Sequence, residues 1–447
     1  MATFAECAAI FPTAGGAYHY ALFLLPEKHR RKAGYPLGWL NFFGWVLTIA
    51  ACASIAAGLT MSLINMCNPD FDTSRRWQLF LFYILWSVVA WAINCFMLSA
   101  VAWIENVIVI MNIASFVAFS IALLAISDKA SPSFVFRDVI DATGASIAVA
   151  LGLVNCMGGF AALDAACHLS EEIERPERNV PITLYFLIGS QFLIGVIYIL
   201  VLGFSIKDME AIQNSVTGVP VIELVRLGLK SDAAAIVFNL VLLIGFVGST
   251  LGSMTAASRQ GYALARDGGL FTRKLTQVSG RNTLPLYSLH LCLLLCIVFG
   301  LVYLFSTEGF NAILGAEVSF MFLSFGSPSA VLLIFGRDKL PKTRFSLGKW
   351  GYGINAFVIF FVGIALVLFA ISGRCAVLVC EPVTDQLLQI PQKHPVNAEN
   401  MNYTVLLWGA VVILCILGWF IDARKSYEPT SFQELAEASS FLQTRTE

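Results

Sequence analysis

Apolar runs about as long as a membrane is thick alternate with short polar segments along this chain of 447 residues. A helix needs about 20 mainly apolar residues to cross the hydrocarbon core of a bilayer. Ten runs reach this length, and each predicts one membrane-spanning helix. The predicted spans are 37–66, 77–100, 105–126, 145–168, 181–204, 233–256, 285–305, 309–335, 352–373 and 403–422. The pattern therefore predicts an all-α membrane protein.

A further apolar segment, 2–25, begins directly after Met1 and is broken by Pro12 and the Gly15-Gly16 pair. Proline cannot continue a regular helix, and glycine readily leaves helical geometry. This segment is therefore predicted to be only a partial span. Since no positively charged region precedes it, a cleaved signal peptide is not expected.

The composition excludes a soluble protein, because 58% of the residues are apolar and 13% are charged. Ordinary soluble domains carry about 25% charged residues. We expect one membrane domain over residues 1–425 and a polar tail over 426–447. The net charge of −1 gives no indication of a nucleic-acid partner.

The positive charges fall on one side of the predicted spans. Most of the 28 Lys and Arg residues lie in alternate loops and in the tail. Positive charge accumulates on the cytoplasmic side of membrane proteins. The C-terminus is therefore predicted to be cytoplasmic, and the plasma membrane is favoured over the vacuolar membrane without a signal that decides between them. The basic segments are 26–36, 169–180, 257–284, 336–351 and the tail.

The span 145–168 contains a carboxylate, Asp164, shortly after the pair Gly158-Gly159. An ionisable side chain at membrane depth is costly and usually functional. The glycines can release the backbone from helix geometry, and secondary transporters bind small polar solutes at helices broken in this way. This span therefore predicts a transporter.

Several motifs resemble the amino acid–polyamine–organocation permease superfamily, and within it the yeast-type amino acid/choline and GABA permeases. The resemblance runs from about residue 3 to residue 425, and it is carried by the set of motifs in order. The segments that match the superfamily are 11–18, 170–181 and 256–270, and those typical of the subgroup are 164–172, 217–220 and 401–405.

The resemblance implies a fold of twelve helices in which the first ten form two inverted repeats. Substrate is held between broken helices one and six. Aligned on the motifs, 145–168 is helix six, 403–422 is helix twelve, and Met1 falls within helix two. Helix one and part of helix two are therefore expected to be missing. A form without helix one is expected not to concentrate substrate, whereas an upstream segment would restore transport.

The resemblance also implies roles for residues of the broken span. Asp164 is expected to couple transport to a proton or to meet a substrate ammonium; a buried, hydrogen-bonded structural carboxyl is the alternative. The glycines could instead allow close helix packing. The predicted substrate-binding residues are Asn155, Cys156, Gly158, Gly159 and Phe160.

Charged residues after the broken span form a candidate inner gate. Salt bridges to Arg259 or Arg266 would close the inner side, although solvated loop charges of little energetic weight are the alternative. The candidate gate residues in the loop are Glu171, Glu172, Arg175 and Arg178.

Four other ionisable residues have open or structural interpretations. Glu317 could bind a cation or be a lumen-facing carboxyl. Glu105 is expected to open its helix and to stabilise the helix N-terminus through its negative charge. Glu6 resembles a family acid of undecided role, and His168 is favoured as a helix-end residue over a proton relay.

The favoured function is a proton-coupled permease for a small amine such as an amino acid, GABA or choline, which works by alternating access. The rival is a non-transporting sensor or an inactive remnant of such a permease. The partners are the amine, the proton and the lipid bilayer. No paired-histidine metal motif, phosphate-binding loop or Gly-x-Ser-x-Gly element occurs in the sequence, so no enzyme, cofactor or metal is expected.

Overall fold

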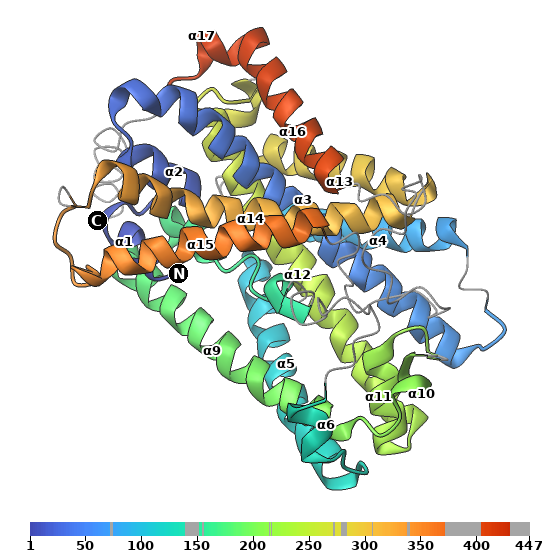
Figure 1. The fold of residues 1–447 in the computed structure, drawn as a ribbon. Helices are drawn as coiled ribbons and strands as arrows, with labels where there is room; N and C mark the ends of the chain where they lie inside the picture. The colour runs from blue at the N-terminus through green and yellow to red at the C-terminus, as the bar shows by residue number, and fades with distance from the viewer. Residues whose placement is uncertain are drawn as a thin grey trace.

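The computed structural model describes residues 1–71, 75–138, 152–153, 156–213, 215, 217–270, 273–278, 284–305, 307–337, 340–371 and 404–429. Throughout these residues the chain is built from helices (Figure 1). Eight helices in the described part are long and apolar enough to cross a membrane. They comprise α3 Glu27–Cys67, α4 Arg76–Phe96, α5 Leu98–Ile126, α9 Pro176–Ser205, α12 Asp232–Arg266, α14 Thr307–Phe335, α15 Trp350–Ile371, and α16 Thr404–Gly418 with its continuation to Ser426.

The remaining elements are shorter. The apolar helix α13 covers Leu286–Phe305, and the continuation of α16 consists of the π-helical turn Trp419–Ala423 and α17 Arg424–Ser426. The others are α1 Ala2–Ile10, α2 Gly16–Leu24, α6 Pro132–Phe136, α8 Ala165–His168, α10 Met209–Gln213, α11 Pro220–Leu229 and the single 3-10 turns Ser170–Glu172 and Arg273–Thr276.

Every predicted span other than 145–168 is found as a helix, with shifted ends. The loop predicted between the second and third spans is reduced to one residue. Helix α4 ends at Phe96 and α5 begins at Leu98, so that Met97 alone joins them. The prediction that Glu105 opens its helix is therefore wrong. Glu105 lies about two turns inside α5, where the helix N-terminus no longer acts on it.

The predicted break in 145–168 is present in its described part. Residues 159–164 form turns, and regular helix resumes only in α8. Ala162 has a φ of 60°, a left-handed conformation that is uncommon for a residue with a Cβ atom. Asn155 and residues 145–151 lie outside the described residues.

The break in the N-terminal segment is also present, between α1 and α2. Gly16 has a φ of 54°, and a Cβ atom at this position would lie 2.7 Å from Cε1 of His168. Only glycine fits there without displacing the imidazole. The two interrupted segments of the chain therefore meet at this point.

The long helix α3 crosses the whole molecule diagonally (Figure 1). Its 41 residues span about 60 Å at about 1.5 Å per residue, twice the thickness of the hydrocarbon core. Buried aromatic side chains of α3 form the centre of the main core, among them Trp39, Phe42 and Trp45. They pack against α12, α14 and α4, which hold α3 in the middle of the bundle.

Candidate functional site

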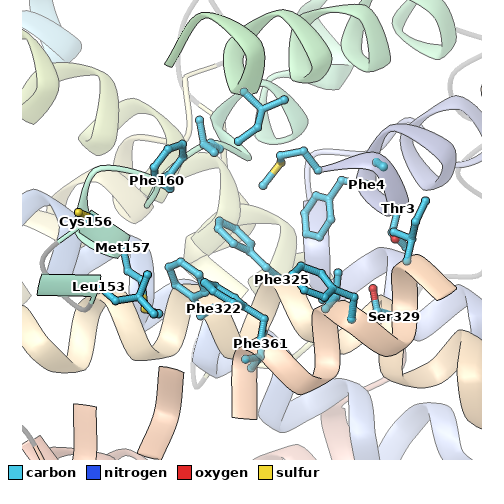
Figure 2. A pocket seen from close by; sticks show the side chains of 18 residues that line it. Thr3, Phe4, Leu153, Cys156, Met157, Phe160, Phe322, Phe325, Ser329 and Phe361 are labelled. Atoms are coloured by element: carbon cyan, nitrogen blue, oxygen red, sulfur yellow. The ribbon is translucent and has the colours of Figure 1, made fainter. Parts of the chain in front are cut away.

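A cavity of about 380 Å³ lies beside the broken span. Its walls come from the start of α1, from Leu153 and residues 156–163, from α9, and from the facing helices α14 and α15 (Figure 2). Ligand sites commonly measure about 300–1,000 Å³ and are mostly apolar. A cavity at the lower end of this range suits a small solute.

Aromatic rings form about a third of the cavity lining, because six of its 18 residues are Phe. Phe325 lies between Phe4 and Phe322, with ring centroids 5.4 and 6.0 Å away. Phe361 continues the row, 6.0 Å from Phe322 and 6.2 Å from Phe357. These separations are typical of aromatic pairs that fix one another in place. None of the described lining residues is Asp, Glu, Lys or Arg.

One end of the cavity is polar. Ser329 lines it, is 1% exposed, and its hydroxyl has no hydrogen-bond partner in the described structure. Thr3 lines the same end and donates a hydrogen bond of 2.7 Å to Oδ1 of Asn355. The Nδ2 atom of Asn355 is buried and unpartnered as well. Buried polar groups are rarely left unsatisfied, so this end is suited to a ligand with a hydrogen-bonding group.

Two of the predicted substrate-binding residues, Cys156 and Phe160, line this cavity. The glycines between them do not pack closely, since a Cβ atom on Gly158 would meet nothing within 4 Å. The N–H groups of Gly159 and Phe160 donate to carbonyls three residues earlier, and the Gly159 carbonyl accepts from Gln191 of α9. The freed backbone groups are thus largely used within the turn. Asn155 lies outside the described residues.

Asp164 is fully buried but does not line the cavity. Its Oδ2 lies 3.2 Å from Nε2 of His168, and its Oδ1 has no described partner. The same Nε2 accepts a hydrogen bond of 2.8 Å from Nε1 of Trp45. Nδ1 of His168 lies 2.8 Å from the Ala14 carbonyl oxygen. Three groups therefore converge on one imidazole.

These contacts fix the tautomer of His168, because one of its partners can only accept a hydrogen bond and another can only donate one. A carbonyl oxygen only accepts, so Nδ1 of His168 carries a hydrogen; an indole N–H only donates, so Nε2 presents its lone pair to Trp45. Asp164 lies against the same nitrogen. The tautomer assignment of His168 rests on the hydrogen-bond network.

The candidate gate contains two ion pairs between the loop after α8 and the end of α12. Glu172 lies 2.8 Å from Arg259, and Glu171 lies 3.2 Å from Arg266. Burial on its own would raise the pKa of Glu171, but the Arg266 guanidinium and the Ala14 N–H outweigh it and lower this pKa. Arg178 is exposed and forms no ion pair with the described part of the chain.

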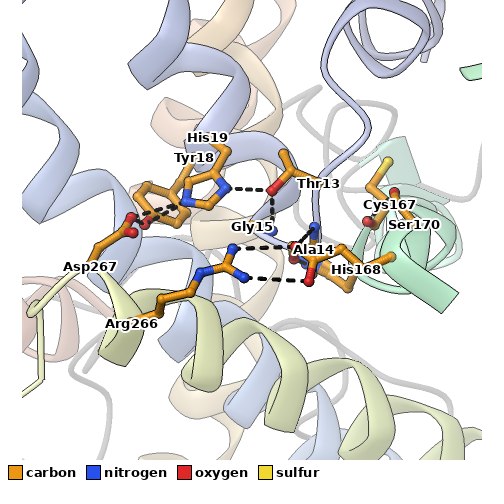
Figure 3. A network of polar contacts seen from close by, with 11 residues as sticks. Thr13, Ala14, Gly15, Tyr18, His19, Cys167, His168, Ser170, Arg266 and Asp267 are labelled. Carbon is orange, nitrogen blue, oxygen red and sulfur yellow. Dashed lines mark hydrogen bonds and ion pairs between the residues drawn. The ribbon is translucent and has the colours of Figure 1, made fainter. Parts of the chain in front are cut away.

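Ala14 joins the two sets of contacts (Figure 3). Its carbonyl accepts from His168, and its N–H donates to Oε1 of Glu171 at 3.2 Å. A row of direct contacts therefore runs from Asp164 through His168 and Ala14 to the Glu171–Arg266 pair. His168 is the last residue of α8, as predicted, and it also contacts Asp164. The four-residue spacing from Asp164, which places both on one helix face, is the sequence signal for the pair.

The other three acids lie apart from the cavity. Glu6 pairs with Arg337 beyond the end of α14, and it accepts a hydrogen bond of 3.0 Å from the Leu347 N–H. Glu317 accepts from the Thr48 hydroxyl at 2.8 Å. Glu105 lies against α12, where a Cβ atom on Gly252 would be 3.3 Å from its Oε1. Each acid contacts an element remote from it in the sequence.

Comparison with known proteins identifies the family. The model of the amino acid permease family matches residues 1–411. The chain belongs to this family. It is an integral, multi-pass membrane protein of a transporter family.

Relatives of this permease have several named substrates. It is 27% identical to the choline transporter of Saccharomyces cerevisiae, over 98% of this chain and 76% of that protein. It is 25% identical to the swainsonine transporter of Arthroderma benhamiae, over 95% of this chain and 81% of the relative. It is 23% identical to an amino-acid permease homolog of Oryza sativa, over 94% of this chain and 80% of that protein. The names establish transport as the shared activity and leave the substrate open.

Proposed function

We propose that this permease carries a small amine-bearing solute, such as an amino acid, GABA or choline, across the membrane together with a proton. The solute would occupy the cavity beside the broken span, where Cys156 and Phe160 contribute to the wall. Its location between a broken segment and the α14–α15 pair favours alternating access, in which one group of helices moves against the other.

The observation that carries the proposal is the buried contact between Asp164 and His168, where we infer that the coupled proton binds. As long as the carboxyl is protonated, the contacts of Oδ2, His168 and Trp45 are compatible. When the proton leaves, a carboxylate faces a lone pair at 3.2 Å in a fully buried place. A buried charge without a partner is strongly unfavourable. Release of the proton therefore favours a different arrangement of the two interrupted segments.

The candidate gate would respond through Ala14. Movement of His168 would pull on the Ala14 carbonyl, and the N–H of the same residue holds Glu171. The Glu171 and Glu172 side chains are 38% and 57% exposed. Such pairs contribute only about 0–1 kcal/mol, so they can open and close during each cycle. The basic inner loops favour a cytoplasmic location for this gate and for the C-terminus.

Uptake into proteoliposomes tests the proposal. The protein is purified together with any segment encoded upstream of Met1 and is reconstituted, and labelled choline, GABA and amino acids are offered with and without an inward proton gradient. We expect saturable uptake of at least one solute. The proton gradient should stimulate this uptake, and a protonophore that collapses the gradient should abolish the stimulation. Folded protein that takes up none of them would overturn the proposal. Saturable binding without uptake would favour a non-transporting sensor.

A further inference from the structure

Residues 419–428, which follow α16, pack against the end of α12. Helix α16 passes into a π-helical turn at Trp419, and α17 follows directly. π-Helical turns are rare and often occur at functional sites. Tyr427, the residue after α17, is fully buried. This part of the chain is therefore held in place by tertiary contacts.

The end of α12 presents a regular surface to these residues. Gly268 has a φ of 73°. Its N–H donates to the Ala265 carbonyl, and the N–H of the next residue donates to the Leu264 carbonyl. These two bonds are the Schellman arrangement, which satisfies the last carbonyls of a helix. A Cβ atom on Gly268 would overlap with the Ser426 carbonyl oxygen, so the two backbones are in direct contact.

Two hydrogen bonds join the same residues to the backbone that follows α12. The Ser426 hydroxyl donates to the Gly268 carbonyl at 3.2 Å. The Glu428 N–H donates to the Asp267 carbonyl at 3.0 Å. Asp267 and Gly268 directly follow Arg266, which forms an ion pair of the candidate gate. Neighbouring Cα atoms are fixed about 3.8 Å apart, so these bonds restrain the position of the gate arginine.

The other contacts of residues 419–428 are with the beginning of α3. The Tyr35 ring packs against Tyr427 and Trp419, with ring centroids 5.5 and 5.4 Å away. The guanidinium carbon of Arg31 lies 5.9 Å from the centroid of the Trp419 ring. Nη2 of Arg31 donates to the Arg424 carbonyl at 2.5 Å. Residues 419–428 therefore connect the beginning of α3 with the end of α12.

We propose that residues 419–428 are an inhibitory clasp, which restrains Arg266 in the position where it pairs with Glu171 and so keeps the candidate gate closed. Glu171 is 38% exposed in this pair, and exposed pairs are weak partly because ordering two long side chains costs entropy. The clasp orders one partner in advance and thereby shifts the equilibrium toward the closed gate. This inference rests on the proposed function, because the gate it regulates belongs to that transport cycle.

Release of the clasp is tested with Arg31→Ala. Arg31 is exposed, so its replacement removes its contacts with the clasp without disturbing the core. The matched control is Lys32→Ala, which removes the same charge from the next exposed position; Lys32 forms no hydrogen bond or ion pair with the described part of the chain. A second variant, Tyr427→Ala, removes the buried ring. Its control is Phe420→Ala, because that ring is 68% exposed in the same segment.

Hydrogen–deuterium exchange reports the state of the gate directly. The protein is purified in detergent together with any segment encoded upstream of Met1. A hydrogen bond of ordinary strength corresponds to about a two- to tenfold change in an equilibrium. We therefore expect both release variants to raise exchange at least about twofold in residues 262–270 and 169–172, but not in α5 or α9, and both controls to match the unaltered protein. The initial rate of solute uptake into vesicles should rise with it.

The outcomes distinguish the clasp from the proposed function. Increased exchange confined to residues 419–428 would overturn the inference, because the gate would then not depend on the clasp. Slower uptake by Arg31→Ala, or an equal change in Lys32→Ala, would overturn it as well. Raised exchange at the gate in a protein that transports no solute would support the clasp and overturn the permease proposal. If Tyr427→Ala does not fold, Arg31→Ala alone decides.

Discussion

Replacing Asp164 by Asn removes a titratable proton while the geometry is retained. Asn has nearly the same shape, and its amide can donate to Nε2 of His168 as the protonated carboxyl does. One neutral hydrogen bond replaces another, so the free energy of unfolding should change by no more than about 1 kcal/mol. The Trp45 and Ala14 contacts of His168 need not move. The variant should therefore fold and reach the membrane.

Transport by Asp164→Asn should nevertheless lose its driving force. A tenfold proton gradient corresponds to about 1.4 kcal/mol, so coupling to one proton permits about tenfold accumulation per pH unit. The amide cannot release a proton, and accumulation should fall to the level found without a gradient. Exchange of internal for external solute needs no net proton movement and should persist, provided that the cavity is intact.

The assay compares gradient-driven accumulation with solute exchange in the same vesicles. A matched control is Asp267→Asn, because Asp267 is also fully buried beside a histidine, with Oδ2 3.0 Å from Nε2 of His19. The control should retain its response to the gradient. Undiminished pH-driven accumulation by Asp164→Asn would refute the assignment of the proton to Asp164 and leave it a structural carboxyl.

Three further predictions follow from other contacts. The pKa of Glu171 is lowered from 4.5, so the contribution of its ion pair is present above that value and is lost only as the pH falls below it. Glu171→Gln should therefore change the uptake rate but not the pH dependence of uptake between about pH 5.5 and 7.5. A pH profile that flattens in this variant would contradict the prediction. Glu6→Ala leaves the buried Arg337 unpaired, and should destabilise the protein by about 3–5 kcal/mol, seen as a lower unfolding temperature; an unchanged temperature would argue against the pair. Trp45→Phe removes the hydrogen-bond donor to the His168 lone pair, and should slow gradient-driven uptake while solute exchange persists; an unchanged rate would contradict the role of this contact.

The spans and the break could be predicted from the sequence because both depend on local chemistry. Apolar length identified the helices, and Gly158-Gly159 marked the interrupted one. The predicted helix ends were less accurate. Leu98 and its neighbours are apolar, so the hydrophobic pattern does not mark the boundary between the two helices that meet there. The charges of 169–180 and 257–284 indicated a gate, and the Glu171–Arg266 and Glu172–Arg259 contacts are indeed present.

The cavity and the tertiary contacts of His168 could not be predicted in the same way. The cavity is assembled from α1, the broken span, α14 and α15, and no local pattern specifies which apolar faces leave a space between them. The Glu6–Arg337 pair joins residues 331 positions apart. The partner of Ala14 likewise depends on tertiary contact, since His168 reaches it across 154 positions.

Proton entry that depends on the solute is the most direct test of the central claim. The chain is reconstituted in vesicles that enclose a pH-sensitive dye, without an imposed gradient, and choline, GABA or an amino acid is added outside. The account predicts that a transported solute acidifies the interior, and that Asp164→Asn vesicles take up protons no faster than empty ones. Solute entry with no change in internal pH would contradict it.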